Sequence, residues 1–365
     1  MTIAAIIAHL ESLAPAALQE SYDNAGLITG SMETHCTGAL VCLDATEEVI
    51  QEAISKKCNL VIAHHPVVFR GLKKINGKNY VERVEIAAIK NDIAVYAIHT
   101  NLDNVLHGVN GMIASKLGLQ ETRVLAEKES FLRKLQVFVP ADYAGAVRSA
   151  IFGAGAGHIG NYSECSFNSE GLGTFRPGKG TTPFSGEEGR QQREPEIKIE
   201  TILPAWLTQQ VLTAIRHAHP YEEVALDLLP LHNISNRMGS GLIGELAVPE
   251  SETAFLERLK LVFGLTVVRH TAFLNKSIRR VAVCGGAGSF LITNALSAGA
   301  DVLVTADCKY HEFFDADGKI MLADIGHYES EQFTIDLIVG VLQEKFPTFA
   351  ALKTVIKTNP VHYFV

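Results

Sequence analysis

The sequence predicts an α/β protein, in which a duplicated α/β core domain carries an inserted α+β domain of the ferredoxin-like type. Two segments, Val41 to Ala63 and Val283 to Thr305, each show the pattern strand, helix, strand. Their strands are short apolar runs, which are typical of strands buried on both faces of a parallel sheet. The stretch between the two segments instead shows the order β-α-β-β-α-β, which would bury a core of its own.

Each half of the core is expected to continue with a further helix and strand, and each ends that strand close to a histidine. Identities between the halves are few, such as Cys42 with Cys284. The repeated pattern therefore fits an ancient duplication, and it equally fits convergence on a common βαβ unit. The expected elements are helices at 1–15, 46–56 and 289–298, and strands at 60–63, 93–98, 302–304 and 320–325.

The inserted domain is predicted to separate the two halves, so that the core comprises residues 1–129 and 234–365 and the insert comprises residues 130–233. The glycine-, proline- and serine-rich stretch 171–190 inside the insert is expected to be a hairpin or loop. The other elements expected in the insert are strands at 135–140, 165–167, 197–203 and 224–228 and helices at 141–152 and 205–218.

The composition is that of an ordinary globular protein. The 365 residues are 47% hydrophobic and 20% charged, and the formal net charge of −8 argues against nucleic acid as a partner. We expect no membrane span and no signal peptide, because charged residues interrupt every long apolar stretch and the start is not basic. The six cysteines lack CxxC spacing, which predicts reduced thiols and a cytoplasmic protein.

The sharpest local motif is His64-His65-Pro66, which directly follows a predicted buried strand. Neutral imidazole is a good ligand for Zn, Fe or Mn, and adjacent histidines can face different ions of a pair. Two surface histidines without a ligand remain the alternative for this motif alone.

Three further residues strengthen the metal interpretation: Asp103, His327 and Glu331 also follow predicted strands, and we expect all of them at the same edge of one sheet. With His64 and His65 they supply three imidazoles and two carboxylates, which suits two divalent ions bridged by a carboxylate. His327 and Glu331 are four residues apart and would share one face of a helix. The alternative for this pair is an acidic first helical turn without a metal.

At these residues the sequence resembles the Nif-three-like family, whose members are also labelled GTP cyclohydrolase I type 2 homologs. The matching motifs are His64-His65-Pro66, His99-Thr100-Asn101-Leu102-Asp103, Gly326-His327-Tyr328-Glu329-Ser330-Glu331 and Tyr22-Asp23-Asn24-Ala25-Gly26-Leu27, where Tyr22 replaces the family's Trp. The resemblance implies that His64, His65, Asp103, His327 and Glu331 bind two divalent metal ions.

The resemblance has two further implications. The inserted segment, which includes His219-Pro220-Tyr221-Glu222-Glu223, is similar to the PII and CutA proteins. Related members form toroidal homohexamers, which implies a homo-oligomer of that kind here.

Other candidate residues would act on a substrate. His99 is a candidate catalytic acid or base, with a buried structural histidine as the alternative. Lys309 and His311 follow the position equivalent to His65 and are candidate substrate-binding residues, with a surface loop as the alternative. Gly285-Gly286-Ala287-Gly288-Ser289 is either a phosphate-binding turn or a tight structural turn.

Two functions are consistent with these residues. The first is a metal-dependent hydrolase-like enzyme that acts on a small anionic or nucleotide-like molecule, with GTP cyclohydrolase activity suggested by the resemblance alone. The second is a metal-dependent regulatory or scaffold protein whose insert senses a metabolite without turnover. The sequence leaves both open.

Overall fold

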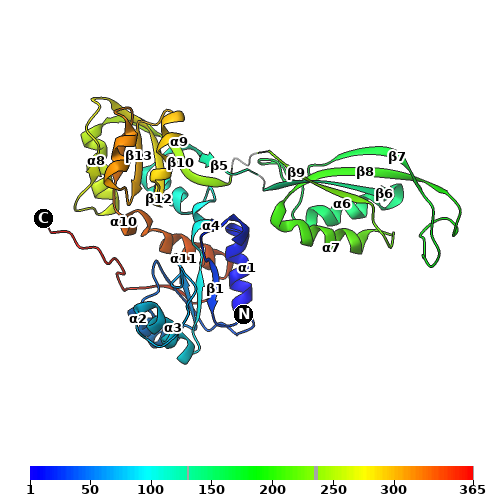
Figure 1. Cartoon of the computed structure of the whole chain (residues 1–365), viewed down its shortest axis with the longest axis horizontal. Helices are drawn as coiled ribbons and strands as arrows, with labels where there is room; N and C mark the ends of the chain where they lie inside the picture. Colours follow the sequence, from blue (N-terminus) through cyan, green and yellow to red (C-terminus); the bar gives the residue numbers. More distant parts are fainter. Residues whose placement is uncertain (130, 234–236, 365) are drawn as a thin grey trace. The chain divides into compact units, whose positions relative to one another are not determined.

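The computed structural model describes residues 1–129, 131–233 and 237–364. It divides into two compact units, one formed by Met1–Glu127 with Arg237–Val365 and the other by Lys128–Asn236 (Figure 1). The predicted boundary positions 130 and 234 themselves lie outside the described residues.

One sheet of the larger unit has five strands in the order β1-β4-β3-β2-β15. We call it the first-half sheet, because only its edge strand β15 comes from the second half of the core. Neighbouring strands from β4 to β15 are parallel, whereas β1 runs antiparallel to β4. Every residue of β2, β3 and β4 is buried, as their apolar composition predicts. The strands are β1 (Gly26–Thr29), β2 (Ala39–Cys42), β3 (Leu60–Ala63), β4 (Ala94–Ala97) and β15 (Ala351–Lys353), and the helices are α1 (Ile3–Leu13), α2 (Glu47–Ser55), α3 (Tyr80–Lys90), α4 (Thr100–Asp103) and α5 (Val109–Leu117).

The other sheet of the larger unit has six strands in the order β11-β14-β13-β12-β10-β5. Its edge strand β5 comes from the first half of the core, and its other strands come from the second half. Its central strands β14, β13 and β12 are parallel, and β11 is antiparallel to β14. The strands are β5 (Gln120–Glu127), β10 (Gly239–Ser251), β11 (Arg269–His270), β12 (Ser277–Ala287), β13 (Val302–Ala306) and β14 (Met321–Asp324), and the helices are α8 (Glu252–Phe263), α9 (Ile292–Ser297), α10 (His327–Glu331) and α11 (Thr334–Lys345).

The two halves therefore repeat one arrangement, an antiparallel edge strand followed by three parallel strands. The expectation that the candidate ligands share one sheet is wrong, because β3 and β4 lie in the five-stranded sheet whereas β14 lies in the six-stranded sheet. The sheets still share a hydrophobic core, in which Val41 and Ile62 of the first half pack in one cluster with Val283 and Val304 of the second.

The smaller unit has the element order β-α-β-β-α-β that the sequence predicts. Its antiparallel sheet has the order β7-β8-β6-β9. The stretch predicted as a hairpin or loop at 171–190 comprises the end of β7, which continues to Phe175, and most of the connection to β8, with which β7 forms a long hairpin. A separate apolar core, which includes Val137, Ile151 and Ile215, lies within this unit. The elements are β6 (Leu132–Pro140), α6 (Ala144–Gly153), β7 (Phe167–Phe175), β8 (Gln192–Pro204), α7 (Thr208–Ala218) and β9 (Leu226–Leu231).

Among the described residues, every helix is too short or too polar to cross a lipid bilayer. The cysteines are all free thiols, and all but Cys165 are buried.

Candidate metal centre

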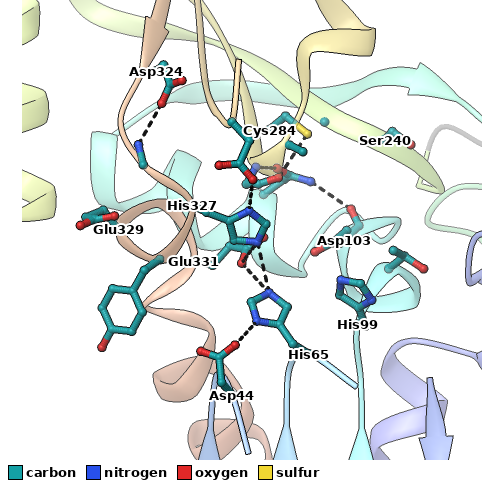
Figure 2. A pocket seen from close by; sticks show the side chains of 18 of the residues that line it. Asp44, His65, His99, Asp103, Ser240, Cys284, Asp324, His327, Glu329 and Glu331 are labelled. Carbon is teal, nitrogen blue, oxygen red and sulfur yellow. Dashed lines mark hydrogen bonds and ion pairs between the residues drawn. The ribbon is translucent and has the colours of Figure 1, made fainter. Parts of the chain in front are cut away.

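The candidate ligands meet where the two sheets present the carboxyl ends of their parallel strands. His64 and His65 directly follow β3, and α10 carries both His327 and Glu331 after β14. Nitrogen atoms of His64 and His65 and an oxygen of Glu331 lie within 4.8 Å of one another. Figure 2 shows His65 between Asp44 on one side and Glu331 with His327 on the other.

The two histidines after β3 are each fixed through Nδ1. His64 Nδ1 donates a hydrogen bond to the carbonyl oxygen of Ile98 at 2.8 Å, and His65 Nδ1 donates to Asp44 Oδ1 at 2.8 Å. A proton on Nδ1 leaves the lone pair on Nε2, which is the form of imidazole that binds a metal ion. Both rings therefore present Nε2 to the cluster.

The histidines that follow β14 and β4 are held in the same way. His327 Nδ1 is 2.7 Å from Asp307 Oδ2, and His99 Nδ1 is 2.8 Å from Asp23 Oδ1. Burial raises the pKa of the Asp23 carboxyl, but its hydrogen bonds outweigh burial and hold the pKa at about 2. Asp23 thus stays an anionic acceptor that fixes the orientation of His99.

Two buried polar atoms in the cluster have no hydrogen-bond partner among the described residues. They are His64 Nε2 and Asp103 Oδ1, which lie 3.7 Å apart. His64 Nε2 is also 3.8 Å from Glu331 Oε1. Leaving such atoms unpaired costs about 1–3 kcal/mol each, and a cation bound by both atoms would remove that cost. The residues present therefore fit a divalent metal ion.

The electrostatics of the cluster favour positive charge. Burial disfavours a charged imidazole, but hydrogen bonds with Asp44 and Glu331 outweigh burial and raise the pKa of His65 to about 10. Similar carboxylate contacts raise the pKa of His327 to about 11. Burial, reinforced by the charge of Glu331, raises the pKa of Asp103 to about 7. A divalent ion would take the place of the protons that these groups hold.

The glycine-rich turn at the end of β12 makes room for the cluster. Gly286 has a φ of +60°, and a Cβ built there would lie 2.4 Å from Glu331 Oε1 and 3.2 Å from His327 Cε1. Gly285 would bring a Cβ within 3.3 Å of Glu331 Cγ. These contacts favour the structural interpretation of the turn, because its glycines pack against candidate metal ligands.

A cavity of about 810 Å³ opens onto the cluster. His65, His99 and Asp103 line it, and aromatic side chains contribute to its wall, among them Tyr22 and Phe69. The lining residues drawn in Figure 2 include Asp44, His65, His99, Asp103, Ser240, Cys284, Asp324, His327, Glu329 and Glu331.

Lys309 and His311 are not among the residues that line this cavity. The chain leaves β13 through Asp307, whose φ of +53° redirects the backbone. Lys309 then precedes a 3-10 helix, and its backbone N–H donates to Glu312 Oε2 at 2.7 Å. Their role in substrate binding gains no support from the cavity and stays a prediction.

Sequence reasoning missed Asp44, which contacts His65, and left Asp23 and Asp307 without a role. The sequence contained only a weak indication of these roles, since each of the three carboxylates lies close to a predicted strand or to a motif named above. No periodicity, however, indicates that a side chain two residues after β2 bonds a histidine after β3.

The fold and the cluster together define an α/β protein with a buried histidine and carboxylate cluster suited to a divalent metal ion. Residues 1–360 match the model of the family described as Duf34/NIF3 (NGG1p interacting factor 3). The chain belongs to this family.

Relatives and solved structures agree with the assignment. Proteins named GTP cyclohydrolase 1 type 2 homolog from Halalkalibacterium halodurans and Bacillus subtilis are 42% and 41% identical, over 88% of this chain and 87% of each relative. The crystal structure of a Bacillus cereus protein related to NIF3 covers 100% of this chain and 99% of its own, with 39% identity and a TM-score of 0.88. The Staphylococcus aureus protein SA1388 covers the same shares, with 29% identity and a TM-score of 0.78.

Proposed function

We propose that the protein binds two divalent metal ions, Zn, Fe or Mn, through His64, His65, Asp103, His327 and Glu331. The position of Glu331 carries this proposal. Its side chain is 3% exposed, and its two oxygens face different ligands. Oε1 faces His64, whereas Oε2 lies 2.9 Å from His65 Nε2 and 3.1 Å from His327 Nε2. One carboxylate oriented in this way can bridge two cations.

The five ligands then fall into two groups. His64 and Asp103 belong with Oε1 of Glu331, and His65 and His327 belong with Oε2. A single tetrahedral ion uses four ligands, so five converging ligands with a shared carboxylate favour two ions.

We further propose that the protein is a metal-dependent hydrolase-like enzyme for a small anionic or nucleotide-like molecule. Paired divalent ions supply a water nucleophile at neutral pH and offset negative charge in the transition state. His99 supports the proposal because it lines the cavity beside the ligands, with its ring centre 5.4 Å from those of His64 and His65. With Nδ1 held by Asp23, its Nε2 can accept a proton from, or return one to, a bound molecule.

The cavity wall fits a molecule with a flat ring and a negative group. Tyr22, Phe69 and Phe290 offer aromatic faces, and Arg269 offers a guanidinium group that also pairs with Asp324. The name GTP cyclohydrolase 1 type 2 homolog belongs to the relatives, and that reaction enters here only as one member of the proposed class. We also propose that the protein is cytoplasmic and assembles into a toroidal homohexamer.

A second candidate function is a metal-dependent regulatory or scaffold protein with a metabolite-sensing, PII/CutA-like insert. The separate core of the smaller unit favours it, because a unit with its own core can bind a ligand independently.

One experiment separates the two functions. The protein is loaded with Mn²⁺ or Zn²⁺ and incubated with a panel of nucleotides, phosphoesters and amides, with a chelated sample as the control. The enzyme proposal predicts product that disappears with chelator and returns with metal. Saturable binding without product from any member of the panel would contradict it and favour the regulatory function.

A further inference from the structure

The segment that follows β15 runs from the first-half sheet toward the second-half helix α10 (Figure 1), where Asn359 contacts Glu329. Near its start, Thr354 and the backbone N–H of Val355 bond to Glu52. Further along, Thr358 Oγ1 donates to Asp44 Oδ2 at 2.7 Å, and Asn359 Nδ2 donates to Glu329 Oε1 at 2.9 Å. Two consecutive residues thus bond to carboxylates from opposite halves of the core.

Thr358 completes a chain of hydrogen bonds that ends at a candidate ligand. Asp44 accepts from His65 through Oδ1 and from Thr358 through Oδ2, so both of its oxygens are occupied. A carboxylate held at both oxygens cannot rotate away from the imidazole it orients.

Side-chain hydrogen bonds hold the segment on the core. In the described part of the chain, no backbone-to-backbone hydrogen bond involves residues 356–364. The segment also forms part of the cavity wall, since Asn359, Pro360, Val361 and Tyr363 line it. We therefore expect the loss of one of these side-chain hydrogen bonds to change the position of the segment relative to the metal centre.

We propose that Thr358 is a positioning residue of the metal centre, and that residues 357–363 form a strap that holds Asp44, and through it His65, in the orientation for metal binding. The inference rests on the proposed metal centre. It extends that proposal, because it assigns a role in metal affinity to a residue that is not one of the five proposed ligands and does not line the cavity.

The test compares three variants of the full chain by titration with Co²⁺ in competition with a chromophoric chelator. Thr358→Val removes the hydroxyl that donates to Asp44, whereas Thr358→Ser keeps a hydroxyl. Thr354→Val is the matched control, since it makes the same change in the same segment and removes a bond to Glu52 instead. The melting temperature of each metal-free protein reports the cost to folding.

We expect Thr358→Val to weaken Co²⁺ binding about 10-fold, the lower end of what losing a group that orients a ligand costs, and to change the visible spectrum of bound Co²⁺. Thr358→Ser and Thr354→Val should bind Co²⁺ as the wild type does. Unchanged affinity in Thr358→Val would overturn the inference, as would an equal loss in Thr354→Val. A wild-type protein that binds no Co²⁺ would instead refute the proposed metal centre, and with it this inference.

Discussion

The two halves of the core share one strand order and differ at the end of the middle parallel strand. After β3 the first half has His64 and His65, whereas the equivalent positions of the second half are Ala306, the last residue of β13, and Asp307. Both halves then place a histidine and an acid four residues apart after the next strand, His99 with Asp103 and His327 with Glu331. The repeated fold thus supplies equivalent positions for the candidate ligands in both halves. The site is asymmetric because different residues occupy the positions of His64 and His65 in the second half.

The asymmetry assigns different roles to equivalent positions. The first half contributes two imidazoles after its middle strand, while Asp307 of the second half instead accepts a hydrogen bond from His327. Glu331 is buried against three imidazoles, whereas the equivalent Asp103 is partly exposed on the cavity. The comparison therefore predicts that substitutions at equivalent positions have unequal effects.

Glu331→Ala should have the largest effect. Removing the carboxylate that faces His64, His65 and His327 leaves each ion short of a ligand, so most of the metal should be lost. Elemental analysis of the purified variant measures this. Glu344→Ala, which removes an exposed carboxylate from α11, is the control and should keep its metal. A Glu331→Ala protein that retains both ions would rule out the bridging role.

His99→Ala should separate proton transfer from metal binding. If His99 moves a proton, its loss lowers kcat about 10²- to 10⁴-fold while the metal content stays at the wild-type value. Kinetics on a substrate from the panel, together with metal analysis, measure both. The exposed His107, changed to alanine, is the control. Loss of metal from His99→Ala would mean instead that His99 is itself a metal ligand.

Asp44→Ala and Asp307→Ala test whether the two halves orient their histidines in the same way. Each variant frees an imidazole Nδ1, and each should weaken metal binding about 10- to 100-fold. Competition titration with a chelator gives the affinities, and Asp317→Ala, whose carboxylate pairs with Lys319 at the surface, serves as the control. A loss in only one of the two variants would show that the halves do not orient their ligands equivalently.

Replacing residues 130–233 by a short linker should have the smallest effect on the metal centre. All five proposed ligands and both sheets belong to the larger unit, so we expect a folded core that binds metal as the full chain does. Circular dichroism and metal analysis check this. Insoluble or metal-free protein from several linker lengths would count against an autonomous insert.

Local sequence patterns predicted most of the central strands. Four-residue apolar runs such as Leu60–Ala63 identify buried parallel strands, and the polar residues after them mark the ligand edge. The division into two sheets was not predictable in this way, because β5 and β10 pair across more than a hundred residues, as Val124 with Leu242, and carry no local signal of their partner.

The candidate ligands were accessible to sequence reasoning because their spacing follows strand ends. The groups that orient them were not, since Thr358 meets Asp44 across 314 positions of the chain. Lys309 is a different case. Its place two residues after the position equivalent to His65 predicted that it lines the cavity. Asp307 has a left-handed backbone and Lys309 is not among the lining residues, so its role in substrate binding stays a prediction.

The central claim is that the two halves together hold two metal ions around Glu331. The most direct measurement is the number of ions per chain, determined by elemental analysis of the full-length protein after loading with Zn²⁺ or Mn²⁺ and removal of free metal. The account predicts two ions per chain in the wild type and close to none in Glu331→Ala. One ion per chain in the wild type, or equal metal content in both proteins, would contradict it.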